Sequence, residues 1–397
     1  MKITNVKART VFIPIEAPLR HSYGSPNGFV RSIIEIETDE DITGLGETFG
    51  WITDASLATI RDLIIGEDPF NLEKIRVQIS QRGYLSRQPL LLAPIEFACY
   101  DIQGKAIGKP VYQLLGGKVR ERVPLSAYLF YRYPDASGEG EVTTPEQMVA
   151  HTKDLVQKYG FSALKLKGGV FDPEHEFQTI VALRDQFGPE YKLRFDPNAI
   201  WAPSTAIRIG EKLRHYDLEY YEDPAWGLNA MANVRSRVAM PLATNMSVIE
   251  FEQLGPAVAM GAIDVILSDP WYYGGLLHTK YLDMMCKTFG LAVGMHSGTE
   301  FGVGLTAMLH VASTMPNLVH AIDSHYHHMV DDIIEGGKLQ YKDGCMAPRD
   351  EPGFGVSLDE DKMNKYEELF KKRQQAADWW YPPDPQRPKW FPIVPSW

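Results

Sequence analysis

Apolar residues recur along this chain in two different rhythms. From Ile3 to Ile15, and again from Arg31 to Thr38, β-forming residues alternate with polar ones, and an acidic turn follows at 39–41. This alternation predicts antiparallel strands. From Ser56 to Gln113 the apolar period is helical, and paired glycines end that region. A sheet followed by helices predicts an α+β domain over residues 1–120.

Beyond residue 120 the rhythm changes to an alternation of strand and helix. Helical patterns at 144–159, 173–187 and 205–213 separate short apolar runs. The runs that we interpret as strands are 123–129, 162–167, 192–196, 218–222, 241–245, 264–268, 291–295 and 319–323. Eight such runs predict an α/β fold, a (β/α)₈ TIM-type barrel over residues 121–330 with the N-terminal domain as its cap.

The last part of the chain, residues 331–397, is expected to return to the cap. Its end, 378–397, is rich in tryptophan and proline, and proline deprives a helix of backbone donors. We expect this end to pack as extended chain on the cap, and an oligomer contact through exposed aromatic side chains is the alternative.

Polar residues stand where the apolar runs end, about one β/α unit apart. Because the carboxyl ends of barrel strands share one rim, their side chains are expected to converge there. The residues are Lys165, Lys167, Asp196, Glu222, Asn245, Asp269 and His296. Asp196, Glu222 and Asn245 would present three oxygen donors, the ligand type that Mg²⁺ prefers. Each of them alone could equally cap a turn or helix.

Two kinds of proton-transfer group accompany these oxygens. Lys165 and Lys167 alternate so that both would point into the barrel mouth, where burial and a nearby cation would lower the pKa of one lysine. The alternative is a solvated strand edge. His296 follows Asp269 by one unit, and a carboxylate on one ring nitrogen would orient the imidazole, although a lone histidine is more often structural. A second metal at His325 and its neighbours is not expected.

Composition excludes several functions. The 397 residues carry a net charge of −11 and no basic cluster, which argues against a nucleic-acid partner. No window is long and apolar enough for a membrane span, and three scattered cysteines are typical of a reducing cytoplasm. P-loop, G-x-S-x-G and H-E-x-x-H motifs do not occur.

A small anionic substrate would be complementary to the positive charges of Lys165 and Lys167. The loop from His21 to Arg31 could close over such a substrate.

Several motifs together resemble the enolase superfamily, in its glucarate dehydratase branch. They are Gly116-Gly117 after the cap, Lys165-Leu166-Lys167-Gly168-Gly169, Asp196-Pro197-Asn198, Glu222-Asp223-Pro224, Thr244-Asn245-Met246, Ser268-Asp269-Pro270, His296-Ser297 and Asp323-Ser324-His325. The resemblance covers nearly the whole chain. The similar cycloisomerase branch carries a lysine where this chain has Ser268-Asp269.

The resemblance implies a role for each matching residue. Asp196, Glu222 and Asn245 would bind Mg²⁺, Lys167 would be one base, and His296, oriented by Asp269, the other base or the acid. Lys165 and Asn198 would polarise the substrate carboxylate. Candidate substrate contacts are Tyr128, His325, Ser297 and His21.

Two departures from that branch concern specificity. The segment between Glu222 and Asn245 is shorter than in typical members, and Arg373 is a poor match for a substrate-binding arginine.

We therefore expect a Mg²⁺-dependent enzyme that dehydrates an acid sugar to a keto-deoxy acid. An epimerase or racemase acting through Lys167 and His296 is the first alternative. A binding protein that has kept the fold without catalysis is the second. Barrels of this kind are often symmetric multimers, so a homo-oligomer is expected.

Overall fold

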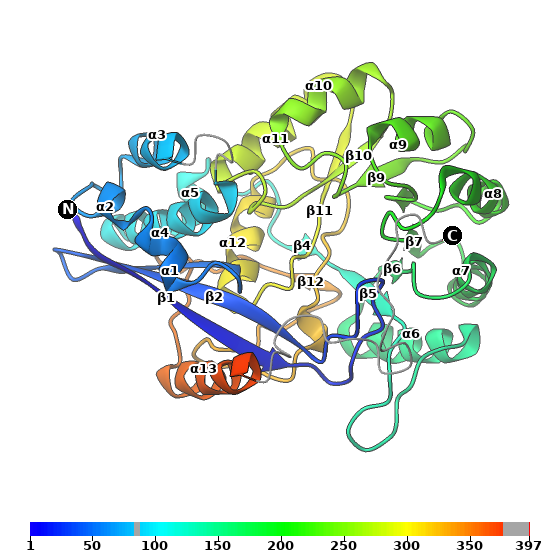
Figure 1. The fold of residues 1–397 in the computed structure, drawn as a ribbon, viewed down its shortest axis with the longest axis horizontal. Coiled ribbons are helices and arrows are strands. Elements are labelled where there is room, and N and C mark those ends of the chain that lie inside the picture. Colours follow the sequence, from blue (N-terminus) through cyan, green and yellow to red (C-terminus); the bar gives the residue numbers. More distant parts are fainter. Residues whose placement is uncertain (83–87, 376–396) are drawn as a thin grey trace.

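The computed structural model describes residues 1–82, 88–375 and 397 (Figure 1). The chain begins with an antiparallel sheet of β1 (Ile3–Pro14), β2 (Gly28–Thr38) and β3 (Thr43–Phe49), in the order β1-β2-β3. Five helices follow: α1 (Asp54–Ala58), α2 (Arg61–Ile64), α3 (Leu72–Arg82), α4 (Pro89–Ile107) and α5 (Val111–Leu114). The predicted capping domain is confirmed as a sheet followed by helices.

Helix α4 lies directly on the sheet because two glycines of β3 leave room for it. A Cβ atom at Gly44 would stand 2.0 Å from the Ala98 carbonyl oxygen, and one at Gly46 would stand 2.0 Å from that of Pro94. The Gly44-Leu45-Gly46 run is therefore a close sheet-to-helix contact, consistent with glycine where backbones approach.

The barrel sheet contains seven parallel strands in sequence order. They are β5 (Ser126–Phe130), β6 (Ala163–Lys167), β7 (Lys192–Asp196), β8 (Tyr220–Glu222), β9 (Leu242–Thr244), β10 (Val265–Ser268) and β11 (Ala292–Met295). The helices are α6 (Pro145–Tyr159), α7 (Pro173–Phe187), α8 (Pro203–Leu213), α9 (Leu228–Arg235), α10 (Phe251–Ala259), α11 (Leu276–Phe289) and α12 (Gly302–Ser313). Each strand leads into the next helix, which is the β/α repeat that the sequence predicts.

The expected eighth strand at 319–323 makes only isolated parallel bridges. Leu318 pairs with Val293 on one side and Ile322 pairs with Leu125 on the other. Ser126 N donates to Ile322 O at 2.9 Å, and Asp323 N donates to Met295 O at 2.9 Å. The sheet therefore closes between β11 and β5, although no regular ladder forms there. Next to this closure β4 (Val123–Pro124) pairs with β12 (Cys345–Met346), and a 3₁₀ turn spans Tyr326–His328.

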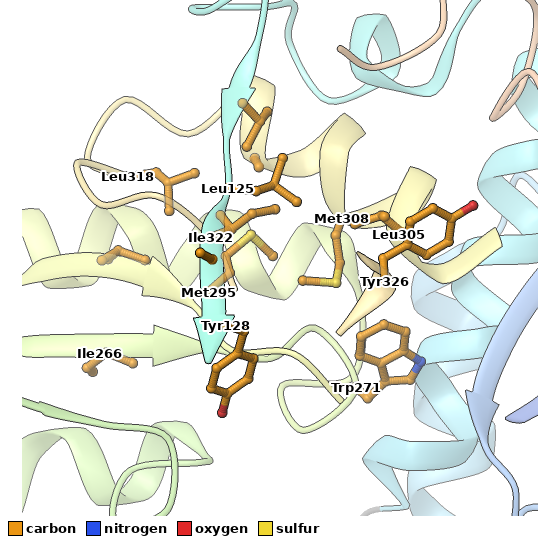
Figure 2. Packing of buried hydrophobic residues seen from close by; sticks show 14 of the residues in the cluster. Leu125, Tyr128, Ile266, Trp271, Met295, Leu305, Met308, Leu318, Ile322 and Tyr326 are labelled. Carbon is orange, nitrogen blue, oxygen red and sulfur yellow. The ribbon is translucent and has the colours of Figure 1, made fainter. Parts of the chain in front are cut away.

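The core extends from the barrel interior to the cap. Leu125, Ile266, Met295, Leu318 and Ile322 are buried around the closing strands, as Figure 2 shows. Helix α12 is buried along its whole length. Because it packs against both β3 and the barrel helix α11, it joins the two domains into one core.

A buried ion pair fixes the cap to the barrel. Arg31 Nε donates to Glu47 Oε1 at 2.8 Å, and Arg31 Nη1 donates to the Gly298 carbonyl at 2.8 Å. Glu47 also accepts the backbone N–H groups of Phe301 and Gly304, at 2.8 and 2.7 Å. We call Arg31 and Glu47 the junction pair. Its charges are balanced and its carboxylate is fully engaged, which is how a buried ion pair persists.

Helix α13 (Glu360–Gln375) packs on the outer side of the cap sheet. Arg9 of β1 pairs with Glu360 at 2.7 Å and with Glu367 at 3.0 Å. Phe370 packs with Phe12 and Val30. The expected return of the C-terminal segment to the cap thus involves α13, whereas residues 376–396 of the Trp/Pro-rich end lie outside the described residues. Within the described part of the chain, no helix is long and apolar enough to cross a membrane.

Candidate active site

A pocket of about 340 Å³ opens at the carboxyl ends of the barrel strands. Among the residues predicted for the site, eight line it: His21, Tyr128, Lys167, Asn198, Asn245, His296, Ser297 and His325. The other four, Lys165, Asp196, Glu222 and Asp269, are buried behind the lining. The predicted residues therefore form one site in two layers.

The two lysines of β6 occupy different layers. They share a strand face, as their alternation predicts, but only Lys167 lines the pocket. Lys167 Nζ lies 2.7 Å from Asp196 Oδ2. Lys165 is fully buried, with Nζ 2.5 Å from Glu222 Oε2 and 2.6 Å from Asp323 Oδ2. Lys165 therefore does not reach the mouth, and it holds the carboxylates of neighbouring strands together from below.

Burial does not lower the pKa of either lysine below its ordinary value, whereas the expected effect of a nearby cation stays a prediction. Burial does lower the pKa of Lys165, but the Asp323 and Glu222 carboxylates outweigh it and raise that pKa well above its ordinary value. Burial of Lys167 is likewise outweighed by Asp196, and its pKa is raised. Both lysines are therefore ammonium groups while these carboxylates face them.

Carboxylates outnumber ammonium groups in this buried cluster. Lys165 also lies 3.6 Å from Asp196 Oδ2, so the two lysines contact three carboxylates. Arg194 lies 3.5 Å from Asp323 Oδ1 but pairs at 2.6 Å with a fourth carboxylate, that of Glu219, so the carboxylates still outnumber the cations. Attraction to the lysines, working against burial, lowers the pKa of Asp196 to about 2. Burial, and then the charge of Asp196, raises the pKa of Glu222 well above its ordinary value. The cluster has room for additional positive charge.

Asn245 connects this cluster to the pocket. In the orientation that satisfies its hydrogen bonds, its amide nitrogen donates to Glu222 Oε1 and Asp223 Oδ2, both at 3.1 Å, and its oxygen accepts from His296 Nε2 at 3.2 Å. Turned over, the amide sets its oxygen next to the Glu222 carboxylate instead. Asp223 is buried and anchors the turn by accepting from Asn245 N at 2.8 Å, and burial raises its pKa to about 7.

The donor set fits a hard divalent cation. Asp196, Glu222 and Asn245 end β7, β8 and β9, which are neighbours in the sheet, and two of them share a 3.1 Å contact. Excess buried negative charge and oxygen-only donors are the features of a Mg²⁺ site. Among the described residues, no group of three or more His, Cys, Asp or Glu side chains could hold a metal ion. The predicted set differs from such a group because its third oxygen belongs to the Asn245 amide.

His296 stands on the pocket wall with a carboxylate behind it. Its Nδ1 lies 3.3 Å from Asp269 Oδ2, and Asp269 Oδ1 accepts from Trp271 N at 3.0 Å. The predicted pairing of this histidine with Asp269 is thus present. In the orientation described above, Nε2 donates to the Asn245 oxygen, whereas an Asn245 oxygen turned toward Glu222 leaves the amide nitrogen facing Nε2.

Three predicted substrate contacts share one polar corner of the pocket. The Ser297 hydroxyl lies 2.7 Å from His325 Nδ1 and donates to Glu300 at 2.9 Å. Burial lowers the pKa of His325 well below its ordinary value and raises that of Glu300 to about 7. The Tyr128 hydroxyl is buried and has no hydrogen-bond partner among the described residues. This corner therefore offers a neutral imidazole and an uncommitted hydroxyl.

The loop that begins at His21 already lies over the site. His21 lines the pocket, and burial, aided by Lys167, lowers its pKa to about 3. Ser22 is hydrogen bonded to the amide of Asn198. Asn198 has φ of 61°, and a left-handed backbone of this kind is tolerated by asparagine. Arg31, the end of the predicted loop, is instead a buried residue of β2.

Sequence reasoning missed two groups of site residues. Asp323 was read only as a strand end, yet it holds Lys165. Aromatic side chains form the outer wall: Tyr23, Phe49, Trp51, Trp226 and Tyr272. Their spacing carried no recognisable signal, because they come from loops of both domains. Arg373 lies elsewhere, on α13, with its guanidinium donating to Asn27 Oδ1 at 2.7 Å.

Comparison with known proteins agrees with this geometry. A family described as Enolase C-terminal domain-like matches residues 147–362, and the Mandelate racemase / muconate lactonizing enzyme N-terminal domain matches residues 3–116. The chain belongs to the enolase superfamily.

Among members of the superfamily, a probable glucarate dehydratase of Streptomyces coelicolor is 39% identical over 89% of this chain and 88% of its own length. An enolase of Mycobacterium smegmatis, solved with tartrate, has a TM-score of 0.89 and 36% identity, covering 100% of this chain and 98% of that one. An enolase of Thermobispora bispora, solved with magnesium and formate, has a TM-score of 0.88 and 38% identity, covering 96% and 100%.

Proposed function

We propose that this chain is a Mg²⁺-dependent dehydratase of an acid sugar related to glucarate. The observation that carries the proposal is one pocket that exposes Lys167, His296 and Asn245 above a buried, carboxylate-rich cluster. The superfamily relatives support it, since one is named a probable glucarate dehydratase and another was solved with magnesium.

Asp196, Glu222 and Asn245 would hold the metal. When bound, Mg²⁺ supplies positive charge beside the substrate carboxylate, which makes the neighbouring C–H bond more acidic. The buried Lys165 keeps Asp196 and Glu222 close together. Lys165 is therefore proposed to position these carboxylates and not, as the sequence had suggested, to contact the substrate carboxylate. Asn198, which lines the pocket, remains the proposed polar contact to the substrate carboxylate.

Lys167 is the proposed base. Its ammonium group is paired with Asp196 at 2.7 Å, and it becomes a base once that carboxylate is drawn toward another cation. It then removes the proton next to the substrate carboxylate. Tyr128, His325, Ser297 and His21 are proposed to bind the substrate hydroxyls, and the aromatic wall excludes water.

His296 is the proposed acid. Asp269 Oδ2 lies 3.3 Å from its Nδ1 and orients the ring, and the proposed role has Nε2 carry the proton that is transferred. It gives its proton to the β-hydroxyl as the carbon–oxygen bond breaks, and water leaves. The resulting enol takes up a proton at carbon and becomes the keto-deoxy acid.

An epimerase is the second candidate. Lys167 and His296 line the same pocket from β6 and from the end of β11, and two acid/base groups around one carbon also invert a centre. A Bacillus cereus relative, 27% identical over 92% of this chain and 98% of its own length, is named an N-succinyl-L-Arg/Lys racemase.

Two further expectations, a cytoplasmic location and a homo-oligomer, stay predictions.

The test is an assay with Mg²⁺ across mono- and diacid sugars in deuterated water. Keto-acid formation and deuterium at the α-carbon are followed together. Keto acid with at least one sugar is the expected result. Exchange or inversion without keto acid would replace the dehydratase with the epimerase, and no reaction with weak metal binding would favour the non-catalytic alternative.

A further inference from the structure

A second cavity, of about 530 Å³, lies away from the catalytic pocket and shares no lining residue with it. Its walls come from three separate parts of the chain: Arg122 just before β4, the middle of α12, and the segment 336–349 that contains β12. Strand β4 is in contact with both α12 and β12, and the three labels stand near one another in Figure 1. The proposed reaction uses none of them.

The charge of this cavity is opposite to that of the chain. Four cationic residues line it, namely Arg122, Lys338, Lys342 and Arg349, and its described lining contains no acidic residue. The whole chain carries a net charge of −11. Cations that repel one another in one concavity are disfavoured unless an anion joins them, and such a concavity concentrates small anions.

Nearby carboxylates neutralise the cationic side chains of the cavity only weakly. Arg122 contacts Asp343 at 3.2 Å, but the Asp343 side chain is 82% exposed, so this pair is weak in water. Lys338 and Arg349 donate to the carbonyls of Met329 and Gly355, at 2.5 and 3.1 Å. Carbonyl contacts fix the directions of these two side chains, and the carboxylates of Glu16, Asp331 and Asp332 act on the Lys338 charge through longer-range attraction.

A buried polar group provides the second, independent observation. Thr306 of α12 lines the cavity, is fully buried, and its hydroxyl has no hydrogen-bond partner among the described residues. A buried hydroxyl without a partner costs free energy. The oxygen lies just beneath the cavity wall, with less than 1 Å² of its surface exposed, so a ligand oxygen reaches it when the wall side chains move aside.

We propose that this cavity binds a small, multiply charged anion through Arg122, Lys338, Lys342, Arg349 and the Thr306 hydroxyl. The anion belongs to the phosphate ester or polycarboxylate class, because both carry several oxygens around a compact centre. The site is separate from the proposed active site and does not depend on the proposed reaction.

Cys345 makes the test direct, because its thiol reports on the cavity. Cys345 lines the cavity and is partly exposed, whereas Cys99 and Cys286 are buried. The metal-free protein is titrated by calorimetry with inorganic phosphate and, separately, with tricarballylate. The rate of Cys345 alkylation by N-ethylmaleimide, a neutral reagent, is measured at each concentration. We expect at least one probe to bind and to slow the alkylation.

Charge reversals locate the binding. Arg122 is 43% exposed on its side chain, and Lys342 is exposed, so Arg122→Glu and Lys342→Glu should fold normally and weaken the binding roughly tenfold each. The matched control Lys192→Glu makes the same change at an exposed position outside the cavity and should stay within about twofold. Thr306→Val removes the hydroxyl at constant volume and should weaken binding without loss of stability.

Each outcome decides. Binding of phosphate alone assigns the phosphate ester class, and binding of tricarballylate alone assigns the polycarboxylate class. If neither probe binds, or if the reversals change nothing, the proposal is wrong. Binding that is lost in Lys167→Met would belong to the catalytic pocket and would also overturn it.

Discussion

Two buried charge clusters, the junction pair and the lysine–carboxylate cluster of the barrel, differ in balance. At the junction pair, one guanidinium meets one carboxylate, and backbone N–H groups occupy the rest of Glu47. In the barrel, the ammonium groups of Lys165 and Lys167 meet the carboxylates of Asp196, Glu222 and Asp323. The balanced cluster joins the cap to the barrel. An unbalanced one keeps a place for positive charge that the chain does not supply.

Removing Lys167 should have the largest effect. Lys167→Ala should lower turnover by about 10²–10⁴-fold, the usual contribution of a general base. Metal affinity should remain nearly intact, because the carboxylates and the amide stay in place. Steady-state kinetics and metal titration check the two parts, with the exposed Lys153→Ala as control. A large loss of metal binding would show that the assignment of Lys167 as a base is mistaken.

Breaking the junction pair should cause the largest loss in the free energy of unfolding. Glu47→Ala leaves Arg31 buried without its partner, and breaking a buried pair costs about 3–5 kcal/mol. Denaturant unfolding measures this loss. The comparison variant Glu360→Ala breaks the ion pair between Glu360 and Arg9. Because the Glu360 side chain is 62% exposed, this loss should cost less than about 1 kcal/mol. Equal losses would remove the distinction between the two pairs.

Added cation should stabilise the barrel cluster and leave the junction pair unaffected. Mg²⁺ at a hundred times its dissociation constant should contribute about 2.7 kcal/mol to the unfolding free energy. The melting temperature should rise, and chelation should reverse the rise. Glu222→Gln should lose this response and Glu360→Ala should keep it. A metal response that survives in Glu222→Gln would place the ion elsewhere.

The dependence of stability on pH should reveal a smaller effect at another buried carboxyl, that of Glu96. Burial raises the pKa of Glu96 to about 7, although Arg76 opposes it. Between its ordinary value and pH 7, the folded protein keeps a proton that the unfolded chain has lost, so stability falls as pH rises through this window. One such group changes the free energy of unfolding by at most about 1.4 kcal/mol per pH unit.

Glu96→Gln should remove this part of the slope. Unfolding of both proteins at pH 5 and pH 7 gives the comparison, with Glu360→Ala as the control. The wild type should lose more stability than Glu96→Gln between the two pH values. A parallel loss in the two proteins would show that Glu96 is already ionised at pH 5.

The sequence was informative wherever a residue ended a strand. Asp196, Glu222, Asn245 and His296 were placed together because strand ends in a barrel share one rim, and the structure brings them together. The α7 helix also lies where its pattern predicted, at Pro173–Phe187. Periodicity fixes which face a residue occupies, and the fold class followed from it.

The burial depth of the two lysines and the charges around them could not be predicted from periodicity. Alternation places Lys165 and Lys167 on one face, but only the carboxylates brought in by β7, β8 and the closing segment decide that Lys165 is buried and that the pKa of both lysines is raised. Asp323 ends a predicted strand, but no local pattern indicates that it pairs with Lys165, which is 158 residues away in the sequence. Interactions between distant segments carry no local pattern.

The cap contributes walls to the pocket, whereas the proton-transfer groups come from the barrel. His21, Tyr23, Phe49 and Trp51 precede α1, and the Arg31 guanidinium lies 4.6 Å from the centre of the Phe49 ring. Substrate preference can therefore drift over evolution through exchanges in these cap segments, while the barrel chemistry is inherited unchanged. The limit on that drift is set by Arg31, because the residue that joins the two domains also supports the wall that would have to vary.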